Sequence, residues 1–304
     1  MIREDLGVPK NVFFSILCFF FFGFLLVCTP LPGSAKGAYT FATYPTNDPA
    51  RVYAAFRVLG EFVAEETGWD VRVVVTRNYE EMQRRLLDGS VDFAIVSPSA
   101  YVRFSSRFSY VATYAEWNEK KGALTPYYRS VIISLKESPV MELRDLKGKN
   151  FGFTDRESTS GHRIPRLMLH AADMEPESFF GNFFYLGRHD AVIQALLAGS
   201  IEGGAVSDGT LENAISRYGD RFRVLAVSDP IPLDAVVASP SVSEEHRELL
   251  CRTLLSISPD SPSMRALQEH LGWPAAGFVE LEDAFYNSLR AAFDLPLPES
   301  GEGE

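Results

Sequence analysis

Three consecutive hydroxyl side chains stand where the sequence predicts the start of a helix. Residues 151–169 read FGFTDRESTSGHRIPRLML, in which a strand-like apolar run and a polar loop precede Ser158, Thr159, Ser160 and Gly161, and an apolar-periodic helix follows. One hydroxyl is enough to cap a helix, so the remaining hydroxyls and the glycine N–H are available to hold the oxygens of an anion. An ordinary helix cap explains these residues equally well, and the segment alone leaves both interpretations open.

Two further polar residues stand at predicted helix starts. His189 precedes Asp190 at the start of a helical pattern, where it is either a solvated first-turn residue or a hydrogen-bond donor to a ligand. Asp208, in SDGT, precedes the helical pattern of residues 211–218 and is typical of an N-cap. These residues taken singly do not decide between structural and functional roles.

The cysteines and histidines do not have the spacing of a metal site or a catalytic pair. Cys18 and Cys28 lie in or beside an N-terminal apolar run, which leaves Cys251 in the body, within an apolar-periodic stretch typical of a packed core thiol. The histidines are scattered, at His162, His170, His189, His246 and His270. We therefore predict no metal, no cofactor and no enzymatic activity.

Short apolar runs alternate with helical patterns along the chain. Strands are expected at residues 39–43, 71–76, 91–96, 151–154, 182–186 and 203–206, and helices at 50–67, 80–87, 167–172 and 190–198. This βαβ rhythm predicts an α/β protein, and 304 residues are enough for two lobes.

Two segments are expected to carry the chain between the lobes. Residues 127–135 form a β-rich stretch suited to a first crossing, and residues 222–238, where Asp229, Pro230 and Pro232 interrupt two apolar runs, suit the return. After residue 243 the remaining pattern is helical, over 244–256, 263–271 and 281–293.

The N-terminus carries an export signal. Residues 11–27, NVFFSILCFFFFGFLLV, are uncharged and apolar, with Arg3 and Lys10 before them and small residues up to Ala35 after them. Such a segment is either a signal peptide that is removed or an anchor that stays in the bilayer. Lipidation of Cys28 is the less favoured alternative, because Val27 stands where a small residue is needed.

These patterns predict a signal peptide or anchor at residues 1–35, a discontinuous lobe 1 at 38–129 plus 232–296, a lobe 2 at 130–231, and a disordered tail at 297–304. The formal net charge of -11 argues against a nucleic-acid partner, whose phosphates need a basic face. It does not exclude a small anion, because amides and hydroxyls can build a local site on an acidic protein.

Three segments together resemble the phosphate, phosphite and phosphonate-binding proteins of ABC importers. They are residues 145–169 (DLKGKNFGFTDRESTSGHRIPRLML), 187–206 (GRHDAVIQALLAGSIEGGAV) and 79–101 (YEEMQRRLLDGSVDFAIVSPSAY). They occur in the family's order and spacing, which makes the combination specific where any single motif would be weak. The resemblance implies a type II periplasmic-binding-protein fold, in which two α/β lobes close on a ligand about a two-crossing hinge.

The resemblance also assigns ligand contacts to particular residues. It implies that one lobe holds the anion with the hydroxyl triplet and its glycine, at Ser158, Thr159, Ser160 and Gly161, and with His189. From the other lobe it implies contacts by Tyr79 and by Tyr128, with Tyr127 a rival to Tyr128 by one place. Rim positions that only cover a core edge are the structural alternative for the tyrosines.

Two acidic residues complete this expected site. The family's acidic residue after the return crossing falls on Asp234, although Ala235 stands where a proline is expected, and a turn cap is the alternative role. Asp208 is a possible contact to a ligand ammonium. Residues 45–49 do not closely match the loop that the family has in the first lobe.

The sequence therefore predicts an exported, periplasmic solute-binding protein that delivers a phosphorus oxyanion, namely phosphonate, phosphite or phosphate, to an ABC transporter permease. Neutral donors would hold the oxygens, while Asp234 would accept a proton from the ligand and so discriminate against sulfate. The alternatives are a periplasmic protein that partners a membrane sensor, and a binder of another small anion such as a sulfonate. We expect a monomer.

Overall fold

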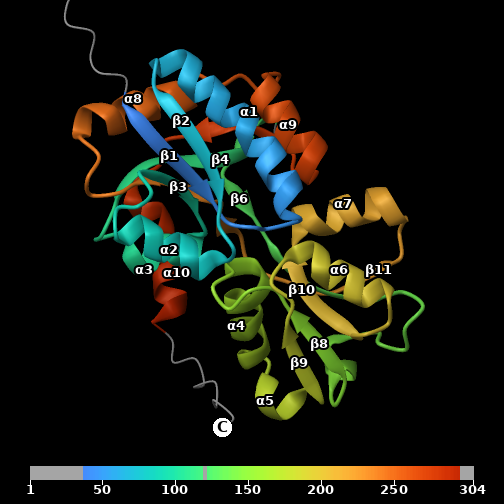
Figure 1. Ribbon diagram of the computed structural model, residues 1–304. Helices are drawn as coiled ribbons and strands as arrows, with labels where there is room; N and C mark the ends of the chain where they lie inside the picture. The colour runs from blue at the N-terminus through green and yellow to red at the C-terminus, as the bar shows by residue number, and fades with distance from the viewer. Residues whose placement is uncertain (1–36, 119–121, 295–304) are drawn as a thin grey trace, which may run out of the picture. The chain divides into compact units, whose positions relative to one another are not determined.

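The computed structural model describes residues 37–118 and 122–294 (Figure 1). The expected signal peptide or anchor at residues 1–35 and the expected tail at 297–304 lie outside the described residues. Across the two described ranges, every helix is too short or too polar to cross a bilayer.

A first sheet, of seven strands in the described residues, has the order β14-β4-β13-β3-β1-β2, with β5 paired to β4. Its strands are β1 (Ala38–Thr43), β2 (Asp70–Val75), β3 (Phe93–Val96), β4 (Ser109–Asn118), β5 (Ala123–Thr125), β13 (Ala235–Ala238) and β14 (Ala275–Val279). The pairs β1–β2 and β1–β3 are parallel, whereas β13 and β14 pair antiparallel to their neighbours.

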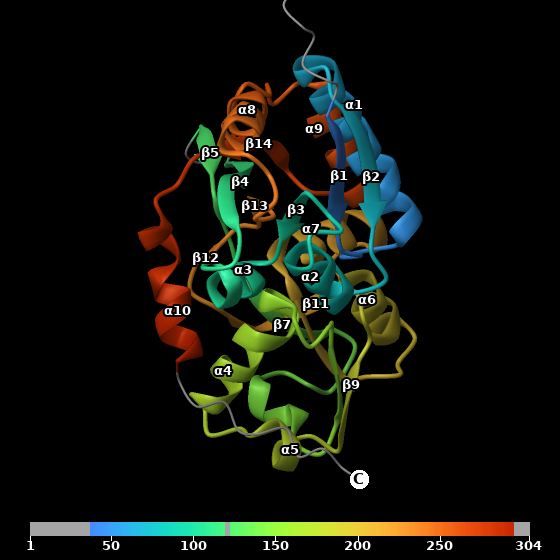
Figure 2. The ribbon, with the colours of Figure 1, turned by 60° about the vertical axis from the view of Figure 1, so that its left-hand side comes forward.

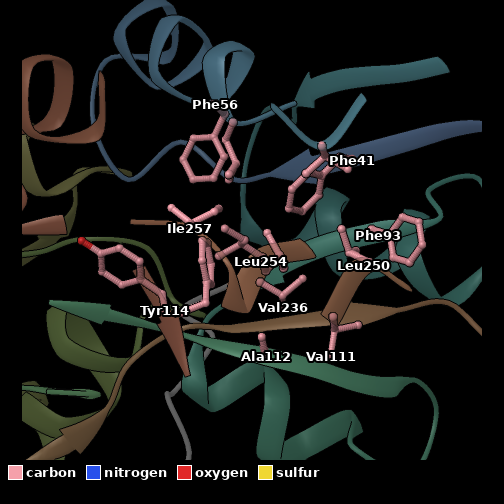
Figure 3. Packing of buried hydrophobic residues seen from close by; sticks show 14 of the residues in the cluster. Phe41, Phe56, Phe93, Val111, Ala112, Tyr114, Val236, Leu250, Leu254 and Ile257 are labelled. Carbon is pink, nitrogen blue, oxygen red and sulfur yellow. The ribbon is translucent and has the colours of Figure 1, made fainter. Parts of the chain in front are cut away.

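Helices cover both faces of this sheet. One face packs on α1 (Pro49–Thr67), α8 (Glu244–Leu255) and α9 (Pro262–Leu271), and the other on α2 (Tyr79–Leu87), α3 (Pro98–Phe104) and the 3₁₀ turn η3 (Asp283–Tyr286), which leads into α10 (Asn287–Phe293). The views agree that α1 and α9 lie side by side (Figures 1 and 2). Alternate residues of β1 serve the two cores, since Phe41 packs with the first set (Figure 3) and Ala42 with the second.

A second sheet has the order β11-β7-β10-β8-β9. Its strands are β7 (Ser130–Leu135), β8 (Asn150–Phe153), β9 (Asn182–Tyr185), β10 (Gly203–Ser207) and β11 (Phe222–Val227). The helices on it are α4 (Ile164–His170), α5 (Pro176–Phe179), α6 (His189–Leu197) and α7 (Asp208–Tyr218), and the 3₁₀ turn η1 (Leu143–Leu146) precedes β8. The strands β8, β9 and β10 run parallel to one another.

The chain passes between the two sheets twice. The first passage contains β6 (Tyr127–Tyr128) and the return contains β12 (Ile231–Pro232), and these two short strands pair antiparallel in a ribbon of their own. Both lie in the segments expected to cross. The residue boundaries of the two lobes stay a prediction.

Most elements expected from apolar periodicity are present within about two residues of their expected ends. The expectation of an all-helical pattern after residue 243 is wrong, because Ala275–Val279 forms β14 against β4. The β-rich stretch at 127–135 is divided at Arg129 into β6 and β7, where the chain leaves the ribbon and enters the second sheet. Neither difference has a local signal, since partner strands far along the chain decide both.

Candidate ligand-binding site

A cavity lies where the carboxyl ends of parallel strands from both sheets converge. In the first sheet the segments after β1, β2 and β3 contribute Tyr44, Thr46, Asn47, Tyr79 and Ser97. In the second sheet the segments after β8, β9 and β10 contribute residues 158–160, His189 and residues 207–210. Carboxyl ends of parallel strands are where α/β sheets place ligand-binding loops, because the strand-to-helix turns open there.

The hydroxyl triplet lines this cavity and is almost fully buried. Ser158 caps the helical turn, since its Oγ accepts from the Gly161 N–H at 3.1 Å. Thr159 Oγ1 accepts from the Ser99 N–H at 2.9 Å and lies 3.0 Å from Ser99 Oγ, so it joins the two sheets. The Ser158 hydroxyl lies near the Tyr79 phenol and the Ser160 hydroxyl near the Tyr128 phenol, so the triplet and both tyrosines share the cavity.

The turn that carries the triplet is wider than an α-helical turn. Residues Thr159–Arg163 form a π-helical turn, in which Arg163 N–H donates to the Ser158 carbonyl at 3.0 Å. Pro165 has no N–H to offer to the Gly161 carbonyl, and that carbonyl instead accepts from Thr154 N–H at 3.0 Å. The Gly161 carbonyl is thus tied back to the residue that follows β8.

Gly161 does not have the role expected from the sequence. Its N–H is occupied by the Ser158 side chain, and it does not line the cavity. The glycine is required for packing instead, because a Cβ there would lie 1.9 Å from Thr154 Oγ1. The expectation that its amide holds the anion is corrected on this ground.

His189 is the first residue of α6 and lines the cavity with 6% of its surface exposed. Ser207 N–H donates to His189 Nδ1 at 3.3 Å, which leaves Nε2 as the protonated ring nitrogen. Burial lowers the pKa of His189 to about 4, so the ring is neutral near pH 7. His189 accordingly presents one N–H donor without a positive charge.

Three residues of the first-sheet side form a connected group around a carboxyl. The Tyr44 hydroxyl donates to Asp234 Oδ2 at 2.6 Å, and the rings of Tyr44 and Tyr79 lie 4.0 Å apart. Burial raises the pKa of Asp234 to about 7, against the opposing effect of the Tyr44 hydrogen bond. Asp234 therefore holds its proton more readily than an ordinary aspartate.

The two neighbouring tyrosines of β6 have different surroundings. Tyr128 lines the cavity beside the hydroxyl triplet, and burial followed by the Asp234 charge raises the pKa of its phenol. Tyr127 is 40% exposed and packs its ring on Phe285 at 4.7 Å, so it does not line the cavity. Successive residues of a strand face opposite sides, which excludes Tyr127 as the rival contact.

Asp208 lines the cavity but its carboxylate is already engaged. Its Oδ1 accepts from Gly209 N–H and its Oδ2 from Arg129 N–H, each at 3.0 Å. The N-cap of α7 is Ser207, whose side chain accepts from Thr210 N–H, and not Asp208. Asp208 therefore fastens the start of α7 to the first passage between the sheets.

The match to a family model decides how this arrangement is to be understood. Residues 41–286 match the model described as "ABC transporter, phosphonate, periplasmic substrate-binding protein". The chain belongs to this family. It is therefore a periplasmic substrate-binding component of an ABC transporter, a class of protein that binds a small ligand and works with a membrane permease. This confirms the resemblance seen in the sequence.

Individual proteins of this kind also resemble the chain in sequence and in structure. The chain is 21% identical to the phosphate-import protein PhnD of Mycolicibacterium smegmatis over 284 residues, 87% of each chain. Among solved structures, PhnD1 of Prochlorococcus marinus in complex with methylphosphonate superposes with a TM-score of 0.73 at 17% identity, over 85% of this chain and 98% of that one. A binding protein of a Pseudomonas aeruginosa phosphonate transporter also gives 0.73, at 18% identity, over 85% and 86%. These structures confirm the two-lobed periplasmic-binding-protein fold.

Several residues around the cavity were not expected from the sequence. They include Tyr44, Thr46 and Asn47 after β1, Tyr114 and Glu116 on β4, and Trp273 after α9. The sequence could have indicated the loop after β1 as part of the site, because this loop follows the first of three predicted parallel strands. The positions of β4 and α9 had none, since their approach to the cavity depends on how distant strands pair.

In the described part of the chain, no three Cys, His, Asp or Glu side chains are grouped as metal ligands would be. Cys251 packs in the core of the first sheet with Leu250 and Leu254, and burial raises the pKa of its thiol.

Proposed function

We propose that this family member captures a monoprotonated phosphorus oxyanion, such as a phosphonate, through neutral donors and one proton-accepting carboxyl. The residues that line the cavity include no Lys or Arg. Ser158, Ser160 and the His189 Nε2–H offer donors from one side, while the Tyr79 and Tyr128 phenols offer them from the other. Where water is excluded, neutral hydrogen-bond donors can hold an anion without placing a second charge in the cavity.

Asp234 is the observation that carries this proposal. Its carboxyl faces an anion-binding cavity, with Tyr44 on one oxygen and no cationic partner. Such a group repels a fully ionised anion but accepts a hydrogen bond from a P–OH. The complex then holds one proton between ligand and Asp234. Sulfate has no proton to give, so it is repelled wherever Asp234 is ionised, as it mostly is at pH 8. The ligand is bound and released unchanged.

The test replaces Asp234 by asparagine and compares ligands by calorimetry. Asp234→Asn should lower methylphosphonate affinity by about 1 to 3 kcal/mol, because an acceptor of the P–OH is replaced by an amide. At pH 8 the same change should raise sulfate affinity, because it removes the repulsion between sulfate and the ionised Asp234. The matched control is Asp70→Asn, an exposed aspartate at the start of β2.

The pH dependence has a definite sign. Above neutral pH both Asp234 and the ligand lose their protons, so wild-type affinity for methylphosphonate should fall as pH rises from 7 to 9. The fall should be shallower in Asp234→Asn. An unchanged phosphonate-to-sulfate ratio together with an unchanged pH profile would reduce Asp234 to a structural residue.

A further inference from the structure

A polar groove adjoins the ligand cavity at the boundary between the two sheets and their helices. It shares two lining residues, Asn47 and Thr210, with the cavity. Its walls are the amino end of α1 on one side and parts of α6 and α7 on the other (Figure 1). Asn213, which also lines the groove, donates to the Leu271 carbonyl at 2.8 Å across the same boundary. The groove therefore lies on the rim of the cavity, where the two halves of the fold meet.

Two arginines line this groove from opposite sides. Arg51 lies in the first turn of α1 and is half-buried, whereas Arg217 lies in the last turn of α7 and is exposed. Among the described residues neither guanidinium has an ion-pair partner, and that of Arg217 lies over the Tyr218 ring at 5.3 Å. A cation in the first turn of a helix opposes the helix dipole, so the fold does not favour Arg51 at this position.

The acidic side chains at the groove are already engaged. Asp190, which lines it, accepts from Arg188 Nε at 3.0 Å. Asp48, next to it in the chain before α1, accepts two backbone N–H groups of that helix. The side chains that line the groove thus carry two positive charges, of Arg51 and Arg217, against the single paired negative charge of Asp190. The groove is a locally positive place on a chain whose formal net charge is -11.

This local charge matters for a small anion that approaches an acidic protein. At physiological ionic strength charges act over roughly 8 Å, so the ligand responds to the groups at the entrance more than to the net charge of the whole chain. A cleft with one sign of charge at its mouth raises the local concentration of an opposite charge and so speeds association. The cavity itself cannot do this, because its lining residues include no Lys or Arg.

We propose that Arg51 and Arg217 form an entry path that draws the phosphorus oxyanion to the mouth of the cavity and has no contact with it once it is bound. This inference rests on the proposed function, because the oxyanion must end in the cavity. An arginine inside the cavity would pair with sulfate as readily as with a phosphonate. Arginines outside it attract every small anion, and selection is left to Asp234 and the neutral donors.

The experiment measures association and dissociation rates of methylphosphonate by stopped-flow protein fluorescence, at an ionic strength of about 10 mM, where surface charges are weakly screened. Arg51→Gln and Arg217→Gln should each lower the association rate constant about two- to fivefold, because each removes one unit charge near the path. The dissociation rate constant should stay unchanged, since neither residue lines the cavity. Arg51→Lys and Arg217→Lys keep the charge and should associate as fast as wild type.

Arg107→Gln is the matched control for the loss of one positive charge. Arg107 is exposed and stands just before β4, whose first residues pair with β13 beside the amino end of β3. It therefore lies at the end of the first sheet opposite the cavity, and its removal should leave both rate constants unchanged. At an ionic strength of about 0.5 M the association rates of wild type and of both Gln variants should converge, because the charges are screened.

The outcomes separate this inference from the proposed function. If wild-type protein does not bind methylphosphonate, the proposed function fails. If it binds and both Gln variants associate at the wild-type rate, the entry path is wrong while the function stands. A faster dissociation with unchanged association would place the arginines in the bound complex, and a loss that persists in the Lys variants or at about 0.5 M salt would indicate a specific guanidinium contact. Either result would overturn the entry path as well.

Discussion

Asp234 shows how a buried carboxyl can lower the stability of the ligand-free fold near neutral pH and above. In the unfolded chain the pKa of this carboxyl is about 4, as for an ordinary aspartate. Burial raises that pKa to about 7 in the folded protein. The protonated form is therefore the one that the ligand-free fold favours. The corresponding stability is present below about pH 4 and is lost as pH rises through 7, because above that value a charge must be buried.

We expect Asp234→Asn to stabilise the ligand-free protein at pH 8. The neutral amide avoids the buried charge, and the gain should be about 1 to 3 kcal/mol, or a few degrees in Tm. At pH 5 the difference should shrink, since Asp234 is mostly protonated there. Thermal unfolding at both pH values checks this, with Asp70→Asn as the control. A variant that is less stable than wild type at pH 8 would contradict the buried-charge argument.

At the scale of elements, the junction between β8 and α4 positions the hydroxyl triplet Ser158, Thr159 and Ser160. Its π-helical turn depends on Pro165, which leaves the Gly161 carbonyl to Thr154, and on the missing Cβ of Gly161, which lets the turn pack on the Thr154 side chain. The contacts of residues 154 and 161 therefore position the hydroxyl triplet.

Gly161→Ala tests this junction. The added methyl would overlap Thr154 Oγ1, so stability should fall by about 1 to 3 kcal/mol and methylphosphonate affinity should fall at least several-fold as the triplet shifts. Differential scanning calorimetry and binding titrations measure the two effects. For stability, Gly209→Ala is a matched control in a first helical turn, where an added Cβ meets no atom within 4 Å, and its Tm should not fall. Wild-type behaviour of Gly161→Ala would show that the turn can relax.

At the scale of the whole fold, the two sheets meet through contacts around the cavity rim. Thr159 bonds Ser99, His189 N–H donates to the Thr46 carbonyl at 3.1 Å, and Asn213 donates to the Leu271 carbonyl at 2.8 Å. Glu157, between Arg103 and Arg163, adds an ion pair across the same boundary. If ligand binding depends on this closed arrangement, contacts outside the cavity should influence affinity.

Ser99 offers the test, because it does not line the cavity. Ser99→Ala should weaken methylphosphonate binding by about three- to tenfold through loss of a hydrogen bond that the closed state makes. In a Thr159→Ala background, Ser99→Ala should lower methylphosphonate affinity by a smaller factor than it does in the wild-type protein. A double-mutant cycle measures this difference. Ser178→Ala, on exposed α5, is the control. Strict additivity of the two changes would show that they act on different steps.

A prediction for the exported protein concerns the N-terminal residues. If the apolar run at residues 11–27 is a cleaved signal, mature protein from the periplasm should begin near Lys36, and N-terminal sequencing or intact mass would show it. Mature protein that retains the run would indicate an anchor, and a cytosolic location would contradict export.

The sequence by itself determined the features that depend on neighbours along the chain. Apolar periodicity predicted most strands and helices, and helix-start patterns singled out Ser158, Thr159, Ser160 and His189. The family resemblance added Asp234, and all five residues line the cavity. These residues were accessible because each follows a strand or begins a helix, and such positions are encoded locally. The family and its fold followed from the order and spacing of the same motifs.

Only the tertiary structure decided which distant residues share the cavity. Tyr114 and Glu116 reach it because β4 pairs with β13 and β14, and Tyr128 faces it while Tyr127 does not because β6 pairs with β12. The Gly161 N–H, expected to face the anion, donates to the Ser158 side chain instead, and Gly161 does not line the cavity. Side-chain convergence depends on strand order and register, which are set by long-range pairing energies that no local pattern contains.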